Sequence, residues 1–94
     1  MTASPPAPPP DARRRRLTVR AWRRGLRELD LLFGGYADAH GAALDEAGLA
    51  EFERLLDEED APMLGWMMGF EPVPPHIDTP LFRAIRDRRA ALKV

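Results

Sequence analysis

The sequence RAWRRGLRELD, residues 20–30, joins a tryptophan, a glycine and a dense set of charges in one short segment. Gly25 tolerates a positive φ, which predicts either a helix cap or a tight turn at this point. The helical spacing of apolar residues on both sides predicts one helix over about residues 12–23 and a second over about residues 26–39. No set of catalytic residues surrounds the segment, so we interpret it as a docking surface.

The second predicted helix has one apolar face. Its apolar and aromatic residues recur at the three-to-four spacing of a buried stripe, and they are Leu29, Leu32, Phe33, Tyr36 and His40. Gly34 and Gly35 in the same helix each weaken it by up to about 1 kcal/mol. We expect these two glycines to allow a close approach between helices.

The central part of the chain predicts two more helices. Asp45 is the expected N-cap of a helix over about residues 46–58. Asp60 is the expected cap of a short, strongly apolar helix that ends at Gly69. Trp66 in that helix has apolar neighbours on both sides, and we expect it to belong to the core.

The last part of the chain predicts a proline-rich loop and a fifth helix. The loop covers residues 70–78, and Thr79-Pro80 is typical of an N-cap followed by proline at the first helical position. The helix should cover about residues 81–91. Because no segment alternates with a period of two for long enough to predict a strand, the expected fold class is all-α, a compact five-helix bundle.

The amino-terminal residues differ in composition from the rest. Five prolines lie within residues 1–12, and no large apolar side chain follows Met1 until Leu17. Proline lacks a backbone donor and favours extended conformations, so we expect a disordered tail over residues 1–12 and a helical domain over residues 13–94. No apolar run is long enough for a secretory signal or a membrane span. We therefore expect a bacterial cytoplasmic protein without membrane insertion.

Residue types that perform catalysis or bind metals are scarce. The chain of 94 residues has no cysteine and only two histidines, His40 and His76, which are not paired at metal-ligand spacing. It has no phosphate-binding loop, dinucleotide fingerprint, calcium loop or Ser/His/Asp set. We expect no metal, no tightly bound cofactor and no intrinsic enzyme activity.

Charge is distributed unevenly along the chain. The net charge is −1, but residues 1–24 hold seven arginines and one aspartate, whereas residues 38–60 hold nine acids and one arginine. Separated charges of this kind steer protein partners during association. A monomer is the expected state of the free protein.

Three features of the basic segment allow two interpretations each. Arg24 and Glu28 are four residues apart, which suits either a surface ion pair worth about 0.2–0.5 kcal/mol or a patch that binds a partner. Trp22 is either a core residue or an exposed interface anchor. The run Arg13–Arg16 is either a solvated helix start or a contact for nucleic acid or anionic lipid. Because the rest of the chain is acidic, we expect no nucleic-acid partner.

The segment RRGLRELD, residues 23–30, also contains the Arg-Gly-x-x-Glu motif of the SdhE-type FAD assembly factors. These are the bacterial counterparts of mitochondrial succinate dehydrogenase assembly factor 2. The residues that flank the motif resemble the family on both sides, through Arg20-Ala21-Trp22 and Asp30-Leu31-Leu32-Phe33-Gly34. A second similarity runs from Phe52 through Leu55, Leu56 and Asp60 to Trp66. The resemblance covers about residues 13–90, and the proline-rich loop over residues 69–78 departs from it.

The resemblance implies a five-helix protein that binds the flavoprotein subunit of succinate dehydrogenase, and in some bacteria that of fumarate reductase. Such a factor promotes covalent attachment of FAD to a histidine of that subunit, so the FAD belongs to the client protein. By match to the motif, Arg24, Gly25 and Glu28 form part of the contact surface. Weaker candidates for the same surface are Arg20, Trp22, Arg23 and Asp30. We expect the bend between the first two helices to present Arg24 and Glu28 outward.

Two other function classes stay open. Some members of this family are antitoxin-like partners in a toxin–antitoxin pair, which would make the chain a regulatory binding protein. An unrelated arginine-rich adaptor for nucleic acid is the third alternative. Nucleic-acid binding would fall steeply with salt because it depends on phosphate contacts, whereas an assembly factor would form a one-to-one complex with a flavoprotein.

Overall fold

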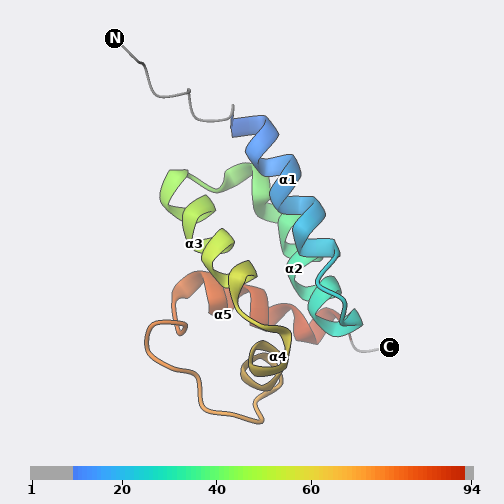
Figure 1. The fold of residues 1–94 in the computed structure, drawn as a ribbon, viewed down its shortest axis with the longest axis vertical. Helices are drawn as coiled ribbons and strands as arrows, with labels where there is room; N and C mark the ends of the chain where they lie inside the picture. The colour runs from blue at the N-terminus through green and yellow to red at the C-terminus, as the bar shows by residue number, and fades with distance from the viewer. Residues whose placement is uncertain (1–9, 93–94) are drawn as a thin grey trace.

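The computed structural model describes residues 10–92, which form helices joined by turns (Figure 1). The five α-helices are α1 (Pro10–Trp22), α2 (Arg27–His40), α3 (Glu46–Asp57), α4 (Asp60–Met68) and α5 (Pro80–Asp87). Two 3₁₀ helices, η1 (Gly41–Ala43) and η2 (Arg88–Leu92), follow α2 and α5. The prediction of an all-α, five-helix bundle is confirmed.

The predicted tail is only partly within the described residues. Residues 1–9 lie outside them, and residues 10–12 form the first turn of α1 instead of belonging to a tail. Pro10 suits this position because the first helical residue has no intrahelical partner for its backbone N–H. None of the helices within residues 10–92 is both long and apolar enough to cross a bilayer.

The core lies between a pair of long helices and the shorter ones. α1 and α2 lie side by side along the long axis, α3 packs beside them, α5 crosses near one end, and α4 closes that end (Figure 1). Phe33 of α2 meets Phe52 of α3 edge to face, with ring centroids 5.7 Å apart. The fully buried large side chains are Leu17, Leu29, Leu32, Phe33, Leu49, Phe52, Met63, Met67, Phe82 and Ile85.

The apolar stripe of α2 ends earlier than predicted. Leu29, Leu32 and Phe33 are buried, and Tyr36 is half-buried against Phe52. His40 is exposed, so its predicted place on the buried face is wrong. The reason is its position as the last residue of α2, where its ring packs on Tyr36 at 4.9 Å between centroids, outside the core.

Two of the three predicted N-caps are confirmed. The carboxylate of Asp45 accepts from the backbone N–H of Gly48 at 2.8 Å, and the hydroxyl of Thr79 accepts from that of Phe82 at 3.3 Å. Asp60 is not a cap, because Glu59 occupies the cap position of α4 and makes no side-chain cap bond. Asp60 is the first residue of α4, and its carboxylate is engaged by Arg24.

The ends of the apolar helices also differ slightly from the expectations. Gly69 ends α4 with φ +80°, as predicted. Trp66 is only partly buried, although it does pack against the core. The fifth helix changes to 3₁₀ geometry at Arg88 and does not continue as an α-helix to residue 91.

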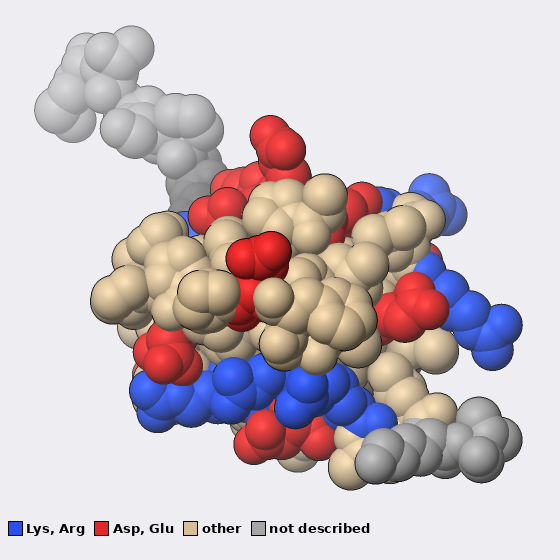
Figure 2. All heavy atoms as spheres, turned by 90° about the horizontal axis from the view of Figure 1, so that it is seen from below, with Lys and Arg blue, Asp and Glu red and all other residues tan. Residues whose placement is uncertain are grey.

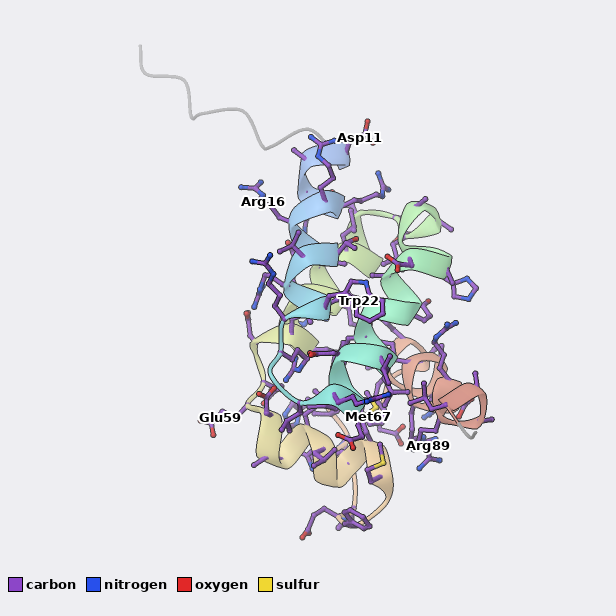
Figure 3. The ribbon with its side chains drawn as sticks, turned by 90° about the vertical axis from the view of Figure 1, so that its right-hand side faces the viewer. Asp11, Arg16, Trp22, Glu59, Met67 and Arg89 are labelled. Carbon is purple, nitrogen blue, oxygen red and sulfur yellow. The ribbon has the colours of Figure 1, made fainter. Side chains whose placement is uncertain are left out.

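Trp22 and Gly34 determine how closely α1 and α2 approach. A methyl group built on Gly34 would overlap the indole ring of Trp22, so the ring lies directly on the glycine. The indole Nε1 donates to the carboxylate of Asp38 at 3.2 Å. Figure 3 shows Trp22 between the two helices. The expectation of a close approach at the glycine pair is therefore confirmed at Gly34.

We predict that Gly34→Ala destabilises the protein by about 1–3 kcal/mol, because Trp22 must leave its place on α2. Gly35→Ala is the matched control, since a methyl there meets only the movable guanidinium of Arg88, at 3.1 Å. The control should lie within about 1 kcal/mol of wild type, because alanine also favours the helix. Urea unfolding followed by circular dichroism measures both. Equal stability of the two variants would contradict the contact with Trp22.

Candidate docking surface at the α1–α2 turn

The turn over residues 23–26 is held in one shape by its own sequence. Gly25 has φ +103°, and any residue with a Cβ atom would strain the backbone in this conformation. One carboxylate oxygen of Asp30 accepts from the backbone N–H of Arg24 at 2.7 Å and from that of Gly25 at 3.2 Å. Asp30 lies in the first turn of α2, where a negative charge is also favourable. It therefore fixes the turn from within.

Arg24 points into the protein. Its side chain is only 3% exposed, so the expectation that it faces outward is wrong. Its guanidinium donates to the backbone carbonyls of Leu55 at 3.3 Å, Leu56 at 3.1 Å and Glu58 at 2.7 Å. These carbonyls lie at the C-terminal end of α3, where the helix leaves acceptors without intrahelical partners. Arg24 caps that end.

The charge of Arg24 is balanced by Asp60, which together with Arg24 and the carbonyls of Leu55, Leu56 and Glu58 forms one cluster. Its guanidinium pairs with Asp60 at 3.1 Å and lies over the ring of Phe33, 4.7 Å from the centroid. Burial lowers the pKa of Arg24, and the negative charge of Asp60 opposes that shift. Within residues 10–92 Arg24 forms no ion pair with Glu28. Sequence spacing could not reveal Asp60 as the partner, since it is 36 residues away.

The other motif residues are on the surface. Gly25 and Glu28 are exposed, Glu28 in the first turn of α2. Arg23 is also exposed. The turn therefore presents a glycine and a glutamate outward on a backbone that Arg24 and Asp30 hold from inside.

Two weaker candidates are exposed but have partners within the chain. Arg20 pairs with Asp57 of α3 at 2.7 Å. Trp22 is 38% exposed and does not belong to the core, although its ring packs on Gly34; its role as an interface anchor stays a prediction. A half-exposed, rigidly held tryptophan beside arginines has the composition of an interface anchor.

The run of four arginines serves two purposes. Arg13 pairs with Glu46 and Glu53, and Arg14 donates to the carbonyls of Gly41 at 3.2 Å and Leu44 at 2.7 Å. These two join α1 to the segments after α2. Arg15 and Arg16 are exposed, and Figure 3 shows Arg16 directed away from the bundle. The interpretation of this run as a solvated helix start therefore fits only Arg15 and Arg16.

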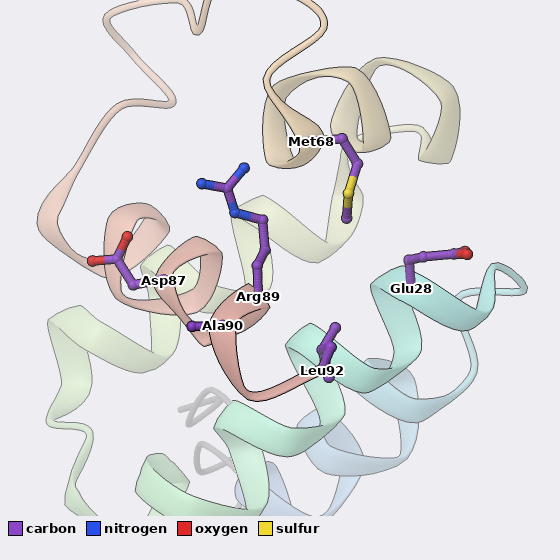
Figure 4. A pocket seen from close by; sticks show the side chains of 6 residues that line it. All are labelled: Glu28, Met68, Asp87, Arg89, Ala90 and Leu92. Carbon is purple, nitrogen blue, oxygen red and sulfur yellow. The ribbon is translucent and has the colours of Figure 1, made fainter. Parts of the chain in front are cut away.

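A groove lies beside Glu28, and no sequence pattern pointed to it. It has a volume of about 740 Å³ and is lined by Glu28, Met68, Asp87, Arg89, Ala90 and Leu92 (Figure 4). Its walls come from α2, the ends of α4 and α5, and η2. Nη1 of Arg89 donates to the carbonyl of Met67 at 2.8 Å, which attaches η2 to α4. No local spacing predicts it, because its walls are far apart in sequence.

The end of the molecule near α4 is poor in charge. Figure 2 shows a largely uncharged area there, with an acidic side chain within it, a band of basic side chains along one side and further acidic side chains around it. Phe70, just after α4, is 77% exposed. Within residues 10–92, no group of three or more potential metal ligands occurs. Exposed aromatic side chains such as Phe70 are enriched at protein interfaces.

Residues 15–89 match the sequence model of a protein family described as "Flavinator of succinate dehydrogenase". The chain belongs to this family. The resemblance drawn from the Arg-Gly-x-x-Glu motif is thereby confirmed.

Individual relatives agree with the family match. The chain is 38% identical over 72 residues to the FAD assembly factor SdhE of Acetobacter pasteurianus, covering 77% of this chain and 66% of that protein. It is 47% identical over 49 residues to the FAD assembly factor SdhE of Xylella fastidiosa, covering 52% of this chain and 50% of that protein. The mitochondrial succinate dehydrogenase assembly factor 2-B of Drosophila melanogaster is 27% identical over 84 residues, covering 87% of this chain and 54% of that protein. The chain thus spans between about half and two thirds of the length of these relatives.

We predict that Arg24→Ala destabilises the fold by about 2–4 kcal/mol, because the carboxylate of Asp60 and the carbonyls of Leu56 and Glu58 lose their partner. Arg24→Lys should fall between this variant and wild type, since an ammonium cannot reproduce the planar set of donors. Arg23→Ala is the matched control and should stay within about 0.5 kcal/mol, as expected for an exposed side chain. Urea unfolding measures all three. An Arg24→Ala protein as stable as the control would show that the cluster contributes nothing to stability.

Proposed function

We propose that this protein is a non-catalytic assembly factor that binds the flavoprotein subunit of succinate dehydrogenase and promotes covalent attachment of FAD to it. The family match over residues 15–89 is the main support. The structure supplies a second argument, because Gly25 and Glu28 of the motif are exposed on a turn that is fixed from inside. A surface that is already ordered loses little conformational entropy when it binds.

The proposed action is selective binding to one state of the client. A factor of this kind favours the client conformation to which it binds more tightly. If that conformation holds the flavin beside its acceptor histidine, the gain in orientation lowers the barrier to bond formation. The flavin supplies the chemistry when bound to the client. On this proposal Glu28 receives a basic group of the client, and Gly25 allows the client to approach the backbone closely.

We predict that Glu28→Ala lowers client binding about 10- to 150-fold, the effect of losing one hydrogen bond to a charged group. Helicity should not change, because Glu28 is exposed and alanine favours helices. Isothermal titration calorimetry with the purified flavoprotein subunit measures the affinity. In-gel flavin fluorescence of that subunit, in a strain that lacks the chromosomal copy and expresses each variant at native level, measures the resulting loss of flavinylation. Full flavinylation with Glu28→Ala would remove Glu28 from the proposed contact.

We predict that Gly25→Arg also impairs flavinylation, through loss of the close approach. The positive φ adds strain of about 1–3 kcal/mol for any side chain, so this variant needs a control with similar strain. Gly69→Arg provides it, because Gly69 has φ +80° and nothing within 4 Å of an added Cβ. The proposal expects Gly69→Arg to rescue the deletion strain and Gly25→Arg to fail. Equal rescue by both would count against a contact at Gly25, and normal flavinylation in the deletion strain itself would overturn the proposed function.

A further inference from the structure

The groove beside Glu28 extends the proposed docking surface to the other end of the chain. We propose that it receives a segment of the flavoprotein subunit that carries one large apolar side chain next to a lysine or arginine. The inference rests on the proposed function, because it takes the flavoprotein as the partner. It adds α4 and η2 to a contact region that the motif places only on the α1–α2 turn.

The shape of the groove suits an apolar side chain. Its volume of about 740 Å³ lies within the range of pockets that bind small-molecule ligands. It is therefore large enough for a large apolar side chain. Met68, Ala90 and Leu92 provide apolar lining, and Figure 4 shows Met68 and Leu92 on different walls of the groove. Methionine adapts its shape to what it contacts. Ala90 is exposed and contributes a small side chain to the η2 wall of the groove.

The charges of the groove favour a basic group. Glu28 and Asp87 contribute two carboxylates and Arg89 one guanidinium, but the carboxylate of Asp87 already lies 4.0 Å from Nε of Arg86. Nη1 of Arg89 already donates to the carbonyl of Met67. Glu28 is exposed, and within residues 10–92 it has no ion-pair partner. A lysine or arginine of the partner would therefore complement the Glu28 side of the groove.

The groove lies next to the Arg-Gly-x-x-Glu motif. Glu28 lines the groove and also follows the turn that exposes Gly25, so one partner segment could contact both. The uncharged area near α4 lies at the same end of the bundle (Figure 2).

Ala90→Trp tests the inference by filling the groove. The matched control is Ala91→Trp, since Ala91 is also exposed on η2 but does not line the groove. Binding of each full-length variant to the purified flavoprotein subunit of succinate dehydrogenase is measured by isothermal titration calorimetry. We expect Ala90→Trp to lose at least about tenfold in affinity, the effect of blocking an anchor pocket. Ala91→Trp should bind like wild type.

Salt dependence tests the charge part of the inference. Affinity of the wild type should fall between low and high salt, because exposed charges are screened. Glu28→Gln should bind more weakly at low salt and show a shallower decline. Ala90→Trp should keep the wild-type decline, since it retains the carboxylate. Identical salt profiles for wild type and Glu28→Gln would overturn the basic partner group.

The outcomes separate this inference from the proposed function. If the wild type binds the flavoprotein and Ala90→Trp binds equally well, or if both tryptophan variants lose affinity equally, the groove is not the site and the proposed function stands. If Ala90→Trp changes only self-association, measured by sedimentation, a second copy of this chain occupies the groove and the inference is wrong. If the wild type does not bind the flavoprotein at all, the proposed function fails as well.

Discussion

The buried guanidinium of Arg24 is the contact on which the rest of the arrangement depends. It joins the α1–α2 turn to the end of α3 through three carbonyls and to the start of α4 through Asp60. Few side chains could replace it, because arginine offers five donors in a fixed plane. Since the fold of this small domain rests on a margin of only a few kcal/mol, a cluster that satisfies several buried groups at once has a large influence on it.

The cluster divides the Arg-Gly-x-x-Glu motif into an inner and an outer part. Arg24 and Asp30 hold the backbone, whereas Gly25 and Glu28 face solvent. On the proposed function, this division lets a short motif combine structural and binding roles, because the inner residues order the surface that the outer ones offer. It also implies that loss of function at Arg24 and at Glu28 would have different physical causes, one in stability and the other in recognition.

Local rules predicted most of the secondary structure. The caps at Asp45 and Thr79 and the stop at Gly69 are determined by neighbouring residues, and they were correct. The errors occurred where a distant residue competed for a side chain or where a helix ended. Asp60 caps nothing because Arg24 engages its carboxylate, and His40 lies beyond the core because α2 stops there. Among the candidate site residues, the sequence predicted the turn at Gly25 but not that Arg24 faces inward.

The sequence by itself determined the helices, the turn at Gly25 and the membership of the family, because each depends on residue types at short spacing. Only the tertiary structure decided that Arg24 is internal, that Trp22 lies on Gly34, and that Glu28 borders a groove built with α4 and η2. These features join residues from 12 to more than 60 positions apart. Periodicity holds no information about such contacts, because they arise when preformed helices pack and compete for the same partners.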